Sequence, residues 1–147
     1  MGPHLHLAFQ EPIAMKIVVL ICRILLGLMF VVFGANIIHA FLPAPPPPPA
    51  DSLAGHFFTA FASSGWIKVV GVFQLLGGLL ILIGGTAPLG LCFLAPVLVN
   101  ILCFHLLLTG GVGIAAGLVA TVLWLVVLYD YRANFAGIFT TKATPTA

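Results

Sequence analysis

Four long apolar segments limit what this chain can fold into. Each is long enough, as a helix, to cover the roughly 30 Å hydrocarbon core of a bilayer. Of the 147 residues 62% are hydrophobic and only 5% are charged, whereas a soluble domain carries about 25% charged residues. We therefore predict an all-α integral membrane protein whose spans cover residues 15–41, 66–83, 88–108 and 112–129.

The connections between these spans differ in length. A few residues join the second span to the third and the third to the fourth, which is enough for turns between antiparallel neighbours. The connection between the first two spans is much longer and begins with PAPPPPPA, a stiff spacer without N–H donors. We expect a four-helix up-and-down bundle with this proline-rich loop between helices 1 and 2.

The loop also carries an aromatic cluster. Phe57, Phe58 and Phe61 are spaced at i, i+1 and i+4, which places them on one side of a helix. This spacing predicts a short amphipathic helix lying at the membrane interface.

Basic residues indicate the orientation in the membrane. Lys16, Arg23, Arg132 and Lys142 lie near the two chain ends, and only Lys68 belongs to the other side. Lys and Arg favour the cytoplasmic side, so both termini are predicted to be cytoplasmic and the proline-rich loop extracytoplasmic.

Several classes of function are disfavoured. Five Lys and Arg in the whole chain are too few for a nucleic-acid surface, which needs clustered cations. Cys22, Cys92 and Cys103 lie in apolar runs without a Cys-x-x-Cys pair, where thiols usually act as small hydrophobic groups. No base and nucleophile pair, metal-binding cluster or phosphate loop is evident, so an enzyme acting alone is the least expected outcome.

Polar side chains inside the apolar spans are the candidate functional residues. Lipid offers them no hydrogen-bond partner, so they are expected to face protein or a polar cavity. Gln74 shares a helical stripe with Gly71 and Gly78, and such small residues allow helices to approach closely; Gln74 should therefore face the bundle. The candidate site consists of Asn36, His39, Gln74, Asn100 and His105.

Three interpretations of these polar residues stay open. They could form interhelical hydrogen bonds that only hold the helices together. Asn36, Gln74, Asn100 and His105 could instead line an outward-opening pocket for a lipophile with a polar head, such as a quinone or a lipid. His39 or His105 could also be the axial ligand of a haem or chlorin.

A second polar pair is predicted at the cytoplasmic side. Arg23 lies in the inner third of the first span and Asp130 ends the fourth. We expect an ion pair between them; the alternative is that Arg23 extends to the lipid headgroups.

Two stretches, RILLGLMFVVFGANIIHAFLPAPPPPP and GVFQLLGGLLILIGGTAPLGLCFLAPVLVNILCFHLLL, resemble the DoxX family of small four-helix membrane proteins. The resemblance covers nearly the whole chain after Met15. It implies a four-helix bundle in the bacterial inner membrane, with relatives linked to quinone-coupled sulfur oxidation and to assemblies that handle oxidative stress. It also divides the chain into an N-terminal extension (1–14), a transmembrane domain (15–132) and a cytoplasmic tail (133–147).

The family's polar positions correspond to Arg23, Asn36, Asn100 and His105. Many members have a glutamate where this chain has Gln74, and a glutamine cannot relay protons. The resemblance favours an accessory or quinone-interacting subunit of a membrane redox assembly, with other membrane proteins as partners. A small-solute transporter or channel and a purely structural scaffold subunit are the alternatives.

Overall fold

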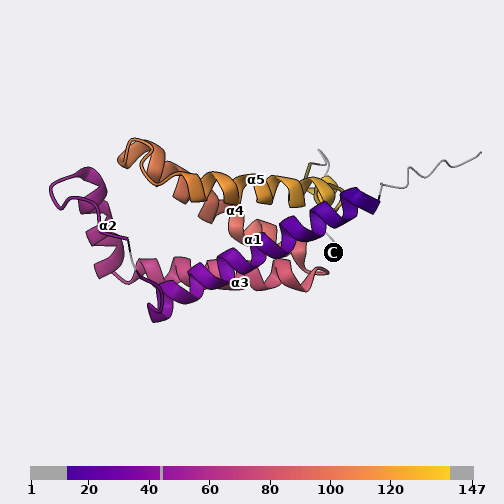
Figure 1. The fold of residues 1–147 in the computed structure, drawn as a ribbon, viewed down its shortest axis with the longest axis horizontal. Coiled ribbons are helices and arrows are strands. Elements are labelled where there is room, and N and C mark those ends of the chain that lie inside the picture. Colours follow the sequence, from indigo (N-terminus) through magenta and orange to yellow (C-terminus); the bar gives the residue numbers. More distant parts are fainter. Residues whose placement is uncertain (1–12, 44, 140–147) are drawn as a thin grey trace, which may run out of the picture.

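The computed structural model describes residues 13–43 and 45–139, and the folded elements in these ranges are all helical. Four longer helices lie along the length of the molecule, and α2 lies across one end of it (Figure 1). In chain order the elements are α1 (Ile13–His39), α2 (Leu53–Ser63), α3 (Trp66–Ile83), α4 (Ala87–Cys103), the π-helical turn η1 (Phe104–Leu108), α5 (Ala115–Asp130) and the 3₁₀-helical η2 (Arg132–Phe139).

The described helices indicate a multi-pass membrane protein with three to four spans. Three helices are long and apolar enough to cross a bilayer: α1, α3 and α4 continued by η1. The fourth, α5, has 16 residues, about 24 Å at 1.5 Å per residue, and reaches a full span only together with η2, from which it is bent by 78°.

Two predicted boundaries need correction. The predicted fourth span begins at residue 112, but Gly111 and Gly113 have φ angles of +94° and +80°, so the chain is still turning there and α5 begins at Ala115. The first helix begins at Ile13, so the last two residues of the predicted extension belong to α1. The rest of that extension, and residues 140–147 of the predicted tail, lie outside the described residues.

Helices α1 and α3 pack against each other through facing glycines. A Cβ atom on Gly34 would lie 2.6 Å from the backbone nitrogen of Leu75 and 2.7 Å from the carbonyl oxygen of Gly71. A Cβ atom on Gly78 would likewise lie 2.7 Å from the carbonyl oxygen of Gly27. The two helices are therefore antiparallel and in backbone contact at two levels, the small-residue packing that membrane helices favour.

The apolar core lies between α1, α3, α4 and α5. Trp124 of α5 donates its indole N–H to the carbonyl oxygen of Leu91 on α4, at 3.1 Å, and a Cβ on Gly90 would lie 2.8 Å from the carbonyl oxygen of Gly77 on α3. The largest side chains that are fully buried in this core are Leu26, Ile81, Leu91, Leu94 and Val127.

Helix α2 confirms the short helix predicted from the phenylalanine spacing. The hydroxyl of Ser52 caps its first turn by accepting from the N–H of Gly55 at 3.0 Å, a typical N-cap. Gly55 lies directly against the carbonyl group of Pro49, so the proline segment packs on the start of α2. Gly65, with φ +77°, then turns the chain into α3.

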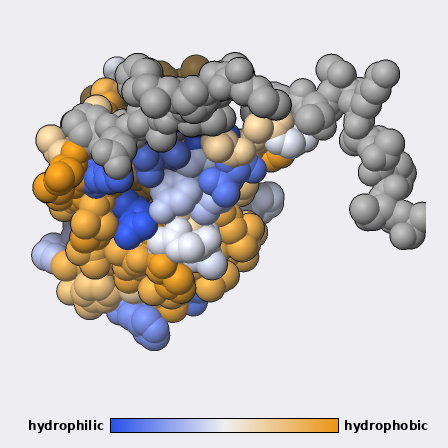
Figure 2. All heavy atoms as spheres, turned by 90° about the vertical axis from the view of Figure 1, so that its right-hand side faces the viewer, coloured by the Kyte–Doolittle hydropathy of each residue, from blue (hydrophilic) through white to orange (hydrophobic). Residues whose placement is uncertain are grey.

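The two ends of the molecule differ in character. One end, here called the α2 end, is where α2 lies across the ends of the longer helices. At the other, here called the Gly84 end, α1 begins and the α3–α4 turn contacts Tyr131. Figure 2 shows hydrophilic residues grouped at the Gly84 end, with hydrophobic atoms around them. Lys16, Asp130 and Arg132 are exposed there, as expected where helices leave a membrane.

The glycine contact predicts a large effect of one methyl group. Gly34→Ala should destabilise the protein by about 1–3 kcal/mol, because backbone atoms cannot move aside as a flexible side chain could. Alanine's better helix propensity offsets about 1 kcal/mol at most. Thermal unfolding in detergent would measure this, with Gly85→Ala as the control because a Cβ at Gly85 meets nothing within 4 Å. Equal melting temperatures for the two variants would contradict the packing argument.

Candidate functional site: a cavity at the α2 end

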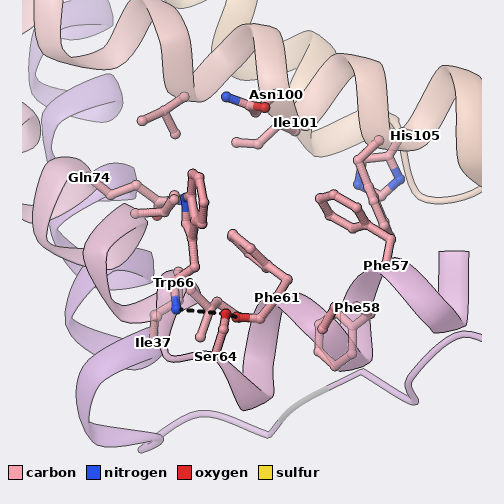
Figure 3. Close-up of a pocket in the computed structure, with 15 residues that line it drawn as sticks. Ile37, Phe57, Phe58, Phe61, Ser64, Trp66, Gln74, Asn100, Ile101 and His105 are labelled. Atoms are coloured by element: carbon pink, nitrogen blue, oxygen red, sulfur yellow. Dashed lines mark hydrogen bonds between the residues drawn. The ribbon is translucent and has the colours of Figure 1, made fainter.

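A cavity of about 610 Å³ opens between α2, α3, α4 and η1. Figure 3 shows Phe61 and Trp66 pointing into it from below, with Asn100 and Ile101 on the opposite wall. Most of the lining is apolar, and five of its side chains are Phe or Trp rings: Phe57, Phe58, Phe61, Trp66 and Phe104.

Ring contacts hold α2 over the cavity. Phe57 and Phe61 lie one helical turn apart and stack at 5.5 Å between ring centres, and Phe57 also meets Phe104 of η1 at 5.7 Å. Such aromatic pairs contribute about 0.5–1.5 kcal/mol beyond the area they bury. The helix predicted from the phenylalanines therefore forms a wall of the site.

Gln74 is the one buried polar side chain among the described residues, with 6% of its surface exposed. It comes from the glycine-lined face of α3, where a Cβ on Gly34 would lie 3.0 Å from the Cβ of Gln74. Its Oε1 is buried without a hydrogen-bond partner. A buried acceptor left unpaired costs about 1–3 kcal/mol. Gln74, which lines the cavity, therefore has an acceptor atom that no other part of the described chain uses.

Asn100 lines the same cavity from α4. Its Nδ2 donates to the carbonyl oxygen of Pro96, one turn earlier, at 2.9 Å. This bond fixes the orientation of the amide, and Oδ1 has no hydrogen-bond partner among the described residues.

His105 lies in η1 and is held by the turn that follows it. Its Nδ1 is 2.7 Å from the carbonyl oxygen of Val112, and because a carbonyl only accepts, Nδ1 is the donor. The hydroxyl of Thr109 lies 2.9 Å from the carbonyl oxygens of both His105 and Val112. In the neutral imidazole, Nε2 is therefore the acceptor left for another group.

Three of the five predicted site residues are thus brought together, and two are not. Asn36 lies beside the end of α1, where its Oδ1 accepts from the backbone N–H of Leu42 at 2.6 Å. His39 is exposed and is the last residue of α1. Neither lines the cavity, so the cavity brings together Gln74, Asn100 and His105, whereas Asn36 and His39 lie at the end of α1.

The prediction of interhelical hydrogen bonds also fails for three of these residues. Asn36, Asn100 and His105 each bond to backbone within their own helix or the turn after it. Lipid does force polar groups to find partners, but the nearest backbone supplies them. For a haem or chlorin, His105 is the one of the two predicted axial ligands that lies at a cavity.

The predicted ion pair between Arg23 and Asp130 is not formed in the described part of the chain. Arg23 instead donates from Nη1 to the hydroxyl oxygen of Tyr131 at 3.0 Å, and that hydroxyl donates to the carbonyl oxygen of Gly84 at 3.3 Å. Asp130 ends α5 on its exposed side, whereas the next residue, Tyr131, turns inward. Arg23, Asp130 and Lys16 line a hollow of about 210 Å³ at this end.

Sequence reasoning missed the aromatic residues that enclose the cavity. The spacing of the phenylalanines in α2 was a usable signal for a helix, but not for its contact with η1. Trp66 is the first residue of α3 and lines the cavity.

Comparisons of the chain with protein-family models, curated proteins and solved structures gave no match. The resemblance to the DoxX family therefore depends on the sequence motifs alone. Among residues 13–43 and 45–139, the His, Cys, Asp and Glu side chains form no group of three or more that could hold a metal ion.

The bonds at the Gly84 end predict a role for one hydroxyl group. Tyr131→Phe should lower the stability by about 1–3 kcal/mol, because Arg23 Nη1 then loses its acceptor while Nε is already buried without a partner. Unfolding in detergent would show this. Tyr129→Phe is the matched control, since Tyr129 is exposed and keeps its ring beneath Arg132. A Tyr131 variant as stable as the control would show that the hydroxyl is dispensable.

Proposed function

We propose that this protein is an accessory subunit of a membrane redox assembly that binds a quinone-type lipophile in the cavity at the α2 end. The observation that carries the proposal is the unpaired Oε1 of Gln74 beside an apolar cavity of about 610 Å³. Ligand sites typically combine such an apolar volume with a few polar groups that orient the ligand. The DoxX-like motifs, which include Asn100 and His105 of this cavity, add an argument by resemblance.

The cavity fits a flat head group with an apolar tail. The rings of Phe57, Phe61 and Trp66 offer faces on which a flat ring can stack. The polar atoms of Gln74 and His105 lie on different elements, α3 and η1, so a head group between them meets polar partners from two directions. A lipid tail can leave toward the hydrophobic surface that the outer faces of the helices present.

The proposal also covers the arrangement of the helices, the membrane in which they lie and their orientation in it. We place the chain in a bacterial inner membrane as a four-helix up-and-down bundle of α1, α3, α4 and α5, with the α2 end and its proline segment extracytoplasmic. The antiparallel contacts of α1 with α3 and of α3 with α4 support this order. Two basic residues near the Gly84 end, Lys16 and Arg132, support the orientation.

A transport pathway is the weaker alternative. Between the cavity and the Gly84 end the bundle contains fully buried side chains, among them Leu26, Ile81 and Leu94. At that end Arg23 is bonded to Tyr131, and Tyr131 to the α3–α4 turn. A solute in the cavity would meet this packed layer, and alternating access usually needs broken helices around a central site.

Filling the cavity should displace its ligand. Ala60 of α2 lines the cavity and Ala62 does not, although both are exposed. Ala60→Trp should therefore reduce the quinone-type lipophile that copurifies with the protein at least severalfold, while Ala62→Trp leaves it unchanged. Solvent extraction of the purified proteins followed by mass spectrometry measures this. An unaltered protein that carries no such lipophile, or equal amounts in both variants, would refute the proposal.

The orientation is tested separately. A cysteine at Ala50, beside the proline segment, should react with a membrane-impermeant maleimide in intact cells. A cysteine at Ala133 should react only after the cells are opened. Both positions are exposed, and Cys22, Cys92 and Cys103 are first replaced by serine or alanine. The reverse labelling pattern would show that the termini are extracytoplasmic.

A further inference from the structure

The hydrogen-bonding groups of the cavity define its ligand more closely than its volume does. We infer that the cavity selects a head group carrying hydroxyls, a hydroquinone or phenol, over the corresponding carbonyl compound. This inference rests on the proposed function, because it assigns the chemical form of the ligand in the same site.

Three side chains of the cavity carry hydrogen-bond acceptors. Gln74 Oε1 is buried and unpartnered, and Asn100 Oδ1 has no partner in the described chain. His105 donates its Nδ1–H to the carbonyl oxygen of Val112, which leaves Nε2 as an acceptor in the neutral ring. All three residues line the cavity, so its wall includes three side chains with an acceptor atom that the described chain leaves unpaired.

The lining side chains of the cavity also carry hydrogen-bond donors. Ser64 donates its hydroxyl hydrogen to the carbonyl oxygen of Phe61 at 3.3 Å. Asn100 donates one of its two amide hydrogens to the carbonyl oxygen of Pro96. The remaining donors are the other hydrogen of Asn100, the NH₂ group of Gln74 and the indole N–H of Trp66. The cavity therefore presents acceptors and donors together.

A quinone and a hydroquinone differ in how they pair with these groups. A quinone carbonyl only accepts, so it serves the donors and leaves Gln74 Oε1 and His105 Nε2 unpaired. A hydroxyl donates and accepts at once, so it satisfies an amide in either orientation. A half-turn about the last side-chain bond of Gln74 would exchange the positions of Oε1 and Nε2, and a hydroxyl can pair with either atom. Sites that hold unpaired polar groups discriminate strongly against analogues lacking the matching group.

The same comparison separates hydroxyls from their ethers. Methylation of both hydroxyls of a hydroquinone keeps the ring and removes both donors. The aromatic contacts of the cavity are unchanged by this replacement, so any loss of affinity reports the donated hydrogen bonds.

The test uses the full-length protein in detergent and three forms of one short-chain benzoquinone: the hydroquinone, the quinone and the dimethyl ether. Isothermal titration under anaerobic conditions measures their affinities. The hydroquinone should bind at least tenfold more tightly than the other two. Gln74→Met, which keeps the side-chain length but removes the amide, should cost the hydroquinone about tenfold and leave the ether unaffected.

The control is Thr121→Val, which removes a hydroxyl that bonds to Gly117 within α5, outside the cavity. It should leave all three affinities unchanged. Should Gln74→Met not fold, the comparison of the three ligands on the unaltered protein decides alone.

The outcomes separate this inference from the proposed function. If the quinone or the ether binds as tightly as the hydroquinone, the selection for hydroxyls is wrong and the quinone-type site stands. If none of the three binds, the proposed function fails as well.

Discussion

The backbone contact between α1 and α3 is the constraint on which the rest of the structure depends. Gly34 and Gly71, and one level further along Gly27 and Gly78, bring the two helices together without intervening side chains. This approach buries the face of α3 that carries Gln74. An amide on that face cannot turn to lipid, and its unused acceptor remains beside the cavity. The packing of small residues thus produces the polar feature from which the site is argued.

Much of the fold could be predicted because it follows from hydropathy and spacing. The α3 boundaries agree with the predicted span, α4 with η1 agrees to within one residue, and α2 was expected from its phenylalanines. The inward orientation of Gln74 followed from its glycine neighbours. The late start of α5 could not be read from an apolar pattern, because it depends on glycine backbone angles in the turn after Thr109.

The site was harder to predict because hydrophobicity identifies which polar groups need partners but not which partners they find. Asn100 and His105 both reach a neighbouring carbonyl, and Asn36 accepts from Leu42. These short-range bonds satisfy most polar groups without linking helices. Arg23 likewise bonds to the hydroxyl of Tyr131 and not to the carboxylate of Asp130. At the end of α5 Tyr131 is half-buried, whereas Asp130 is exposed.

The π-helical turn η1 determines which side chains the end of α4 presents to the cavity. A π-turn holds about one residue more than an α-helical turn, so side chains beyond it are shifted by about 100° around the axis. Removing one residue between Phe104 and Leu108 would restore the regular spiral and present a different side chain to the cavity. Inserting or deleting one residue in η1 would therefore change which side chains face a bound ligand, while the apolar helix before it keeps its length.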